Sequence, residues 1–160
     1  MGPTTLLVAA VVLATAEFCA EPLDGGVEEP QFCRVTSPLE LSTPFFTITV
    51  EPHFLVGIDR GGRRLQVQSS LWQSQDYLLI EVREDSDNSR WNRCSEIDVW
   101  IENGVAWQDC RTATNSMHER LLMVSMPQRY VLIDYGYSSL GSESAPALER
   151  MTQSIRIHAI

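Results

Sequence analysis

Short runs of alternating apolar and polar residues recur along the chain, and turn-forming residues separate them. Alternation with a period of two is typical of half-buried β-strands, and FFTITV at residues 45–50 shows it with β-branched residues. YLLIEV at residues 77–82 is apolar on both faces, as in a fully buried strand. The predicted strands are residues 45–50, 53–58, 65–69, 77–82, 97–102, 105–110, 121–126, 130–135 and 154–160.

Eight or nine short strands with turns at regular spacing predict an all-β fold. The expected architecture is an antiparallel β-sandwich of immunoglobulin-like type, with a barrel as the alternative. The only helix expected is a turn or two over residues 147–153, because no segment has the periodicity of a long helix.

The clearest element is a hairpin in which IDVWIE and VAWQDC flank Asn103-Gly104. Asn-Gly favours a two-residue type I′ turn, which fixes the register and places Trp100 opposite Trp107. One face of the hairpin then carries Ile97, Val99, Ile101, Ala106 and Cys110, and the other carries Asp98, Trp100, Trp107 and Asp109. We predict that the first face belongs to the core.

The second face of this hairpin is the candidate contact surface. An aromatic pair, Trp100 with Trp107, flanked by Asp98 and Asp109 is suited to a sugar ring, a peptide or a partner protein. The alternative is that both faces of the hairpin are covered and the tryptophans only fill the core.

The chain divides into three parts. Residues 1–16 resemble a secretory signal peptide, with an apolar run too short to span a membrane and a small-residue cleavage site. Residues 17–44 contain four prolines and Gly25-Gly26, which predicts an irregular N-terminal arm. Residues 45–160 are expected to form a single β domain. A secreted, extracellular location follows from the signal peptide.

Four cysteines remain after cleavage at residue 16, which in an oxidising compartment predicts two disulfides among Cys19, Cys33, Cys94 and Cys110. If the hairpin ladder continues, Cys94 lies opposite Ala113, about 10 Å along the strand from Cys110 and on the other face. This favours a disulfide from each of Cys94 and Cys110 to a cysteine of the arm. A strand that ends near Glu96 would restore the local pair.

The formal net charge of −9 argues against nucleic acid or an anionic membrane as a partner. EDSDN at residues 84–88 clusters oxygen ligands, but it lacks the glycine of a calcium-binding loop, so a solvated loop is the preferred interpretation. The three histidines have no metal-binding spacing, and no nucleophile or phosphate-binding motif is present. No metal, cofactor or catalytic residue is therefore predicted.

Two segments, PFFTITVEPHFL at residues 44–55 and WQDCRTATNSMHERLLMVSM at residues 107–126, resemble signature stretches of the placenta-specific and oocyte-secreted protein family. Those proteins are small secreted relatives of the ZP-N module of egg-coat proteins. The resemblance implies a ZP-N-like sandwich and a reproductive role through protein association. It also implies that Cys94 and Cys110 pair with earlier cysteines and not with each other. Arg111 stands where the family has a glycine.

The sequence therefore predicts a secreted, non-enzymatic protein-interaction or recognition module, acting in reproductive or cell-surface recognition. Its expected partner is an extracellular protein or glycan. An extracellular carrier of a small apolar ligand inside a barrel is the alternative, and a secreted hydrolase is less favoured.

Overall fold

The computed structural model describes residues 19–22, 32–59, 61–69, 76–84, 94–102, 105–113, 117–138 and 142–158. Three segments considered above lie outside the described residues: the predicted signal peptide at 1–16, residues 85–88 of the EDSDN loop, and Asn103-Gly104. Within the described part, the longest helix is far too short to reach across a membrane.

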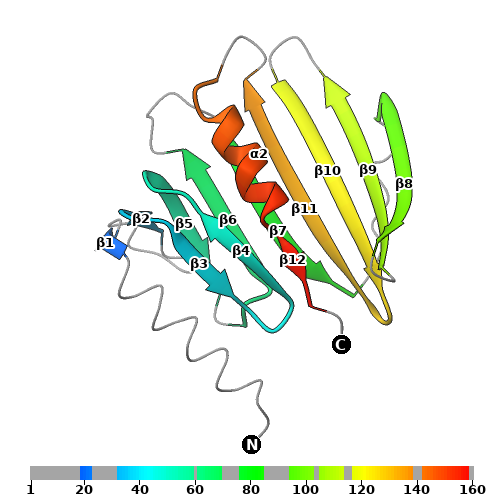
Figure 1. Cartoon of the computed structure of the whole chain (residues 1–160), viewed down its shortest axis with the longest axis horizontal. Helices are drawn as coiled ribbons and strands as arrows, with labels where there is room; N and C mark the ends of the chain where they lie inside the picture. The colour runs from blue at the N-terminus through cyan, green and yellow to red at the C-terminus, as the bar shows by residue number, and fades with distance from the viewer. Residues whose placement is uncertain are drawn as a thin grey trace, which may run out of the picture.

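A nine-stranded antiparallel sheet forms one layer of the molecule (Figure 1). In spatial order its strands are β1 (Cys19–Pro22), β2 (Cys33–Val35), β5 (Phe54–Ile58), β6 (Arg64–Ser69), β7 (Tyr77–Arg83), β11 (Arg129–Ser138), β10 (Met117–Met126), β9 (Val105–Ala113) and β8 (Glu96–Glu102). The described sheet is open, with β1 and β8 at its two edges, so the barrel alternative is wrong.

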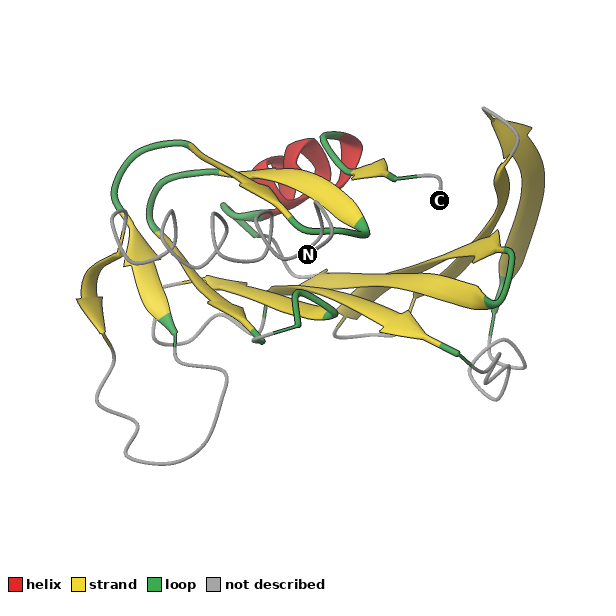
Figure 2. Cartoon of the chain, turned by 90° about the horizontal axis from the view of Figure 1, so that it is seen from below, coloured by secondary structure: helices red, strands yellow, loops and turns green. Residues whose placement is uncertain are grey.

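The second layer lies over one face of the large sheet (Figure 2). It contains a three-stranded sheet in the order β12 (Arg156–Ile157), β4 (Phe46–Val50) and β3 (Leu39–Ser42), together with helix α2 (Ala145–Gln153). At the β8 edge of the large sheet, the β8–β9 hairpin bends toward the face that the second layer covers (Figure 2). The predicted antiparallel β-sandwich is confirmed.

The main core fills the space between the two layers. The large sheet contributes alternate residues such as Val67, Ile80 and Ile133, and the second layer contributes Phe46 and Leu148, all of them buried. Period-two alternation explains this arrangement, because every second side chain of β6, β7 and β11 points toward the second layer.

Helix α2 is fixed at both ends. At its start, Ser142 donates a hydrogen bond to the buried carboxylate of Asp76 and accepts one from the backbone N–H of Ala145. In its last turn, Arg150 forms two hydrogen bonds of 2.8 and 2.9 Å with Glu51, just after β4. Bidentate arginine–carboxylate pairs fix orientation, so α2 is held in place across the large sheet.

The N-terminal arm is more regular than predicted. Residues 17–44 contain β1, β2 and β3, and the last two pair with strands of the domain: Cys33 with Val56, and Leu41 with Ile48. Backbone pairing therefore joins the arm to both layers. The prolines interrupt the strands without preventing them, which is why the composition alone predicted an irregular segment.

The register of the β8–β9 hairpin is confirmed, since Trp100 pairs with Trp107 and Ile97 with Cys110. The prediction of which face is buried is wrong for β8. Ile97, Val99 and Ile101 are 53%, 65% and 77% exposed, although Cys110 on the same face is buried. The second layer lies on the tryptophan side of the sheet, and β8 is the edge strand, so no described element covers the isoleucine side.

The predicted disulfide pairing is also wrong, because Cys94 bonds to Cys110 with their Cα atoms 5.4 Å apart. The pairing of β8 with β9 extends only as far as Glu96, the first residue of β8. The backbone N–H of Ser95 donates to the carbonyl of Arg111, so Cys94 does not continue the ladder and lies next to Cys110 instead. This pairing differs from the one that the family resemblance implied. Cys33 is disulfide-bonded as well, and no described cysteine is free.

The Cys94–Cys110 bond closes a loop with a sequence separation of 16 residues. Replacing both cysteines with serine should lower the free energy of unfolding by about 3 kcal/mol, the chain-entropy effect expected for such a loop. Chemical denaturation of the oxidised proteins measures this loss. Peptide mapping that links Cys94 to Cys19 or Cys33 would contradict the pairing.

Candidate functional site

The candidate site is a groove of about 690 Å³ between the curved β8–β9 hairpin and the second layer. We call it the tryptophan groove. Its lining residues come from β8 to β11, helix α2 and β12: Trp100, Glu102, Trp107, Arg120, Leu122, Tyr135, Glu149, Thr152, Gln153, Ile155, Arg156 and Ile157. A hollow of about 330 Å³ adjoins it and shares Arg120, Tyr135 and Glu149. The two together form a continuous polar and apolar surface.

One wall of the groove is the tryptophan pair. The rings of Trp100 and Trp107 stack with 7° between their planes and 5.9 Å between their centroids. Trp107 also packs against the main core, whereas Trp100, on the edge strand, is exposed. The inner ring anchors the outer one, so a flat aromatic surface is held facing the groove.

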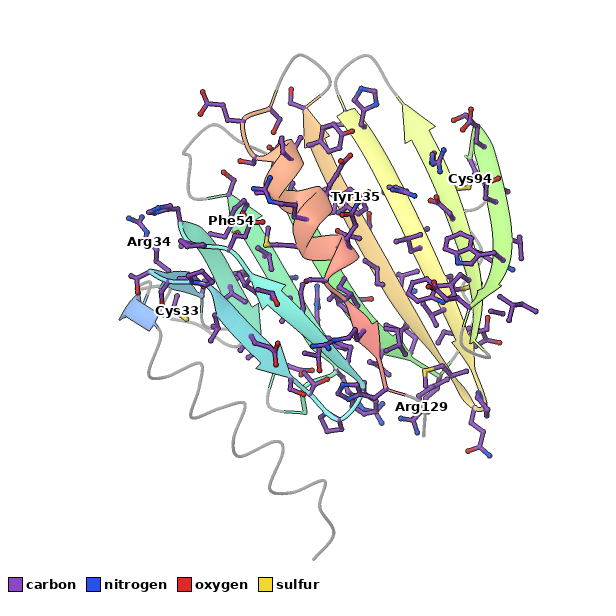
Figure 3. All side chains as sticks on the ribbon, in the orientation of Figure 1. Cys33, Arg34, Phe54, Cys94, Arg129 and Tyr135 are labelled. Atoms are coloured by element: carbon purple, nitrogen blue, oxygen red, sulfur yellow. A yellow bond between two sulfur atoms is a disulfide. The ribbon has the colours of Figure 1, made fainter. Side chains whose placement is uncertain are left out.

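A row of side chains lies side by side across four strands and runs from the adjoining hollow to the floor of the groove. The register pairs Glu96 with Arg111, Arg111 with Arg120, and Arg120 with Tyr135. Tyr135 lies beside α2 (Figure 3). The register therefore places Arg111 next to Arg120. Because two like charges on neighbouring strands repel each other, this arrangement is stable only with a negative charge close to both.

Asp109 supplies that charge from beneath the row, with its side chain only 1% exposed. Arg120 donates to it through Nε at 3.0 Å and through Nη2 at 2.7 Å. Arg111 donates from the other side at 3.1 Å. A buried carboxylate is stable only when it is paired and hydrogen-bonded, and here two guanidinium groups meet that requirement.

Arg120 is fixed by a second partner, because its Nη1 donates to the hydroxyl of Tyr135 at 3.0 Å. The hydrogen bond to Asp109 is the largest cause of a raised pKa for Arg120, and it outweighs the burial that lowers it. Burial raises the pKa of Tyr135, against the opposing effect of the Arg120 charge. The groove floor therefore presents a permanently charged guanidinium in one orientation.

The structure brings together only part of the predicted contact surface. Trp100 and Trp107 line the groove, but Asp109 lies below it as a support for Arg120. Asp98 is exposed on the edge strand, 3.6 Å from Arg111. Of the four predicted residues, Trp100 and Trp107 thus lie at the groove, Asp98 is at the exposed edge, and Asp109 is buried under Arg120.

Arg120, Tyr135 and Glu149 were not predicted as site residues. Arg120 does have a sequence signal, since it alternates with Leu122 and Val124 on one strand face. Knowing that this face adjoins Asp109 requires the β9–β10 register, and no Asn-Gly turn sets that register. Glu149 is on the helix, whose position across the sheet is a tertiary feature.

A second hollow, of about 470 Å³, lies on the opposite face of the large sheet, with Tyr77, Asp134, Glu119 and Cys110 among its lining residues. Tyr77 donates a hydrogen bond of 3.0 Å to the buried Asp134. The Tyr77 ring lies over Gly136, where an added Cβ would approach it to 2.8 Å. These contacts account for the aspartate as a structural group.

Within the described residues, no group of three or more histidine, cysteine, aspartate or glutamate side chains could hold a metal ion. Two of the acidic side chains near the groove, Glu96 and Asp109, both pair with Arg111. The chemistry that this arrangement offers is binding, through aromatic stacking and hydrogen bonds from a fixed guanidinium.

No protein-family model matches the sequence, and no curated protein matches it. Among solved structures, the chain is similar to the solution structure of cyanobacterial PsbP (CyanoP) from Synechocystis sp. PCC 6803, with a TM-score of 0.57 and 9% sequence identity. The match covers 84% of this chain and 96% of the other. At this identity the similarity concerns the fold alone.

Replacing Asp109 with asparagine should destabilise the protein by about 3 kcal/mol, because two arginines then lose their shared carboxylate. The matched control is Asp98→Asn, which removes an exposed ion pair and should cost less than about 1 kcal/mol. Urea denaturation of both variants measures the difference. Equal effects of the two substitutions would contradict the supporting role of Asp109.

Tyr135 should lose its proton at a higher pH than the ordinary tyrosine value of about 10, because its hydroxyl is buried. Its folded-state pKa is raised, so its contribution to stability is fully present below the ordinary value of about 10 and is lost as the pH rises through the raised folded-state pKa. A difference titration of tyrosinate absorbance between the wild type and Tyr135→Phe measures it. A Tyr135 transition at or below the ordinary value would contradict the structure.

Proposed function

We propose that the chain is a secreted, non-enzymatic recognition module that binds a segment of an extracellular partner protein in the tryptophan groove. The observation that carries this proposal is the stacked pair of Trp100 and Trp107 along a groove whose floor holds the fixed guanidinium of Arg120.

The residue types in the groove favour a protein partner. Tryptophan, tyrosine and arginine are the residues that contribute most to protein–protein binding energy, and Trp100, Trp107, Tyr135 and Arg120 all line this groove. The lining combines apolar residues such as Leu122 and Ile155 with charged residues of both signs, a mixture that protein interfaces also contain. A polypeptide can match that mixture of charges better than a neutral glycan can.

The groove is also preorganised. Arg120 donates three hydrogen bonds to Asp109 and Tyr135, which leaves two of the five N–H donors of a guanidinium for a ligand, counted over the described residues. A side chain that is already ordered loses little conformational entropy when it binds. An acceptor on the partner, such as a carboxylate or a backbone carbonyl, is the group that Arg120 would recognise.

Extracellular action is supported by the cysteine chemistry. Disulfides persist in oxidising compartments, and Cys33, Cys94 and Cys110 are all disulfide-bonded. The signal peptide predicted over residues 1–16 is consistent with secretion.

The test is selection of binding peptides from a phage-displayed random library, followed by affinity measurement with the free peptides. Trp100→Ala should weaken the binding of the selected peptides about 30-fold, the effect expected for an aromatic hot spot. The matched control is Val99→Ala on the opposite face of β8, which should change the affinity less than about twofold.

Two outcomes would overturn the proposal. One is that Trp100→Ala binds the selected peptides as tightly as the wild type does. The other is that the protein selects no peptide but binds sugars on a glycan microarray in a Trp100-dependent way, which would make the groove a glycan site.

A further inference from the structure

The outer edge of strand β8 presents a second interaction surface, which shares Trp100 and Glu102 with the tryptophan groove. It is the last strand of the described sheet, and all seven of its residues, Glu96–Glu102, are exposed. Sheet edges are normally protected by short strands, proline, lysine or bulges. β8 is seven residues long, contains neither proline nor lysine, and pairs with β9 without a register shift. Its outer edge is therefore able to pair with another strand.

The backbone groups for that pairing can be identified from the register. In an antiparallel ladder, alternate residues direct their N–H and C=O groups away from the neighbouring strand. Counted from the connection between Glu102 and Val105, the outward residues are Ile97, Val99 and Ile101. They also carry the exposed apolar side chains of β8, which extend the buried cluster of Cys110, Leu121, Met123 and Leu132 to the edge.

The other face of β8 is acidic. Glu96, Asp98 and Glu102 alternate with the apolar residues and flank Trp100. Among the described residues, Arg111 lies near two of them, 3.5 Å from Glu96 and 3.6 Å from Asp98, and it also bonds to Asp109. Three exposed carboxylates with one shared arginine leave the strand with a net negative charge, within a chain whose formal net charge is −9.

This charge disfavours a second copy of the same chain as the occupant. An antiparallel pair centred on Val99 would place Glu96 opposite Glu102, and a shift by two residues would place Asp98 opposite Asp98 or Glu102. Like charges directly opposite each other destabilise a strand pair. The acidic residues thus act against edge-to-edge association of identical chains, and they favour a strand with basic residues.

We propose that β8 binds an extended segment of a partner protein in which apolar and basic residues alternate, so that the segment becomes a tenth strand of the sheet. Its backbone pairs with Ile97, Val99 and Ile101, and its apolar side chains cover theirs. Its lysines or arginines lie beside Glu96, Asp98 and Glu102, and one of them is able to lie over the ring of Trp100. This surface goes beyond the tryptophan groove, because its backbone and apolar contacts are at Ile97, Val99 and Ile101, which do not line the groove.

The probe is a capped eight-residue peptide that alternates valine and lysine. One control peptide alternates valine and glutamate, and a second has four valines followed by four lysines. The alternating basic peptide should bind about tenfold more tightly than either control, since only it matches both the pattern and the charge. NMR should show slowed hydrogen exchange for the amides of Ile97, Val99 and Ile101.

Two variants separate the apolar contribution from the charge contribution. Val99→Lys places a cation on the apolar face and should abolish binding, whereas Val99→Ala keeps that face apolar and should weaken binding only about threefold. Asp98→Asn combined with Glu102→Gln should reduce affinity for the basic peptide about tenfold, because the opposite-charge pairs are lost. Unchanged shifts of the β10 and β11 amides show that each variant is folded.

Three results would overturn the proposal: equal binding of the two lysine peptides, no protection of the Ile97, Val99 and Ile101 amides, or a dimer in sedimentation velocity that Val99→Lys dissociates. If Trp100→Ala no longer binds the phage-selected peptides, the proposal for the β8 edge is unaffected. Failure at the edge is therefore distinguishable from failure in the groove.

Discussion

The shape of the candidate site depends on one buried carboxylate. The strand register places Arg111 beside Arg120, and such neighbours would repel each other without Asp109 between them. The cost of burying Asp109 is offset only because both guanidinium groups bond to it. Arg120 then fixes the hydroxyl of Tyr135, which joins β9 to β11 across the groove floor. The buried carboxylate of Asp109 thus determines where the guanidinium of Arg120 is held at the surface.

The pairing of residues could be predicted where a local signal sets it. Asn103-Gly104 determined the β8–β9 register correctly, since a two-residue turn leaves one way to count outward. The β9–β10 register, which brings Asp109 under Arg120, has no such signal at residues 114–116. The sandwich class followed from the alternation of many short strands. The arm was misjudged because its strands are only three or four residues long, and β2 pairs with β5, more than 20 residues further along the chain.

The side of a strand that is buried is a tertiary property, and the sequence pattern of the hairpin did not reveal it. Ile97, Val99 and Ile101 are more apolar than the opposite face, yet they are exposed because the second layer lies on the tryptophan side. The disulfide prediction failed for a related reason. The register was right, but the ladder ends at Glu96, and one turn of the backbone at Ser95 is enough to bring Cys94 to Cys110. Strand ends are set by such local hydrogen bonds more than by alternation.

Successive residues of β8 point to opposite faces of the sheet, so the strand has two different surfaces. Trp100 faces the groove, where the inner ring of Trp107 and the core support it, while Val99 faces solvent on the other side. An apolar edge of this length favours aggregation unless something opposes it. The carboxylates of Glu96, Asp98 and Glu102 oppose it by charge and leave the backbone accessible. A proline or a bulge would have blocked every incoming strand, whereas negative charge blocks acidic ones and admits basic ones. An edge protected in this way is selective, which is the property that a recognition surface needs.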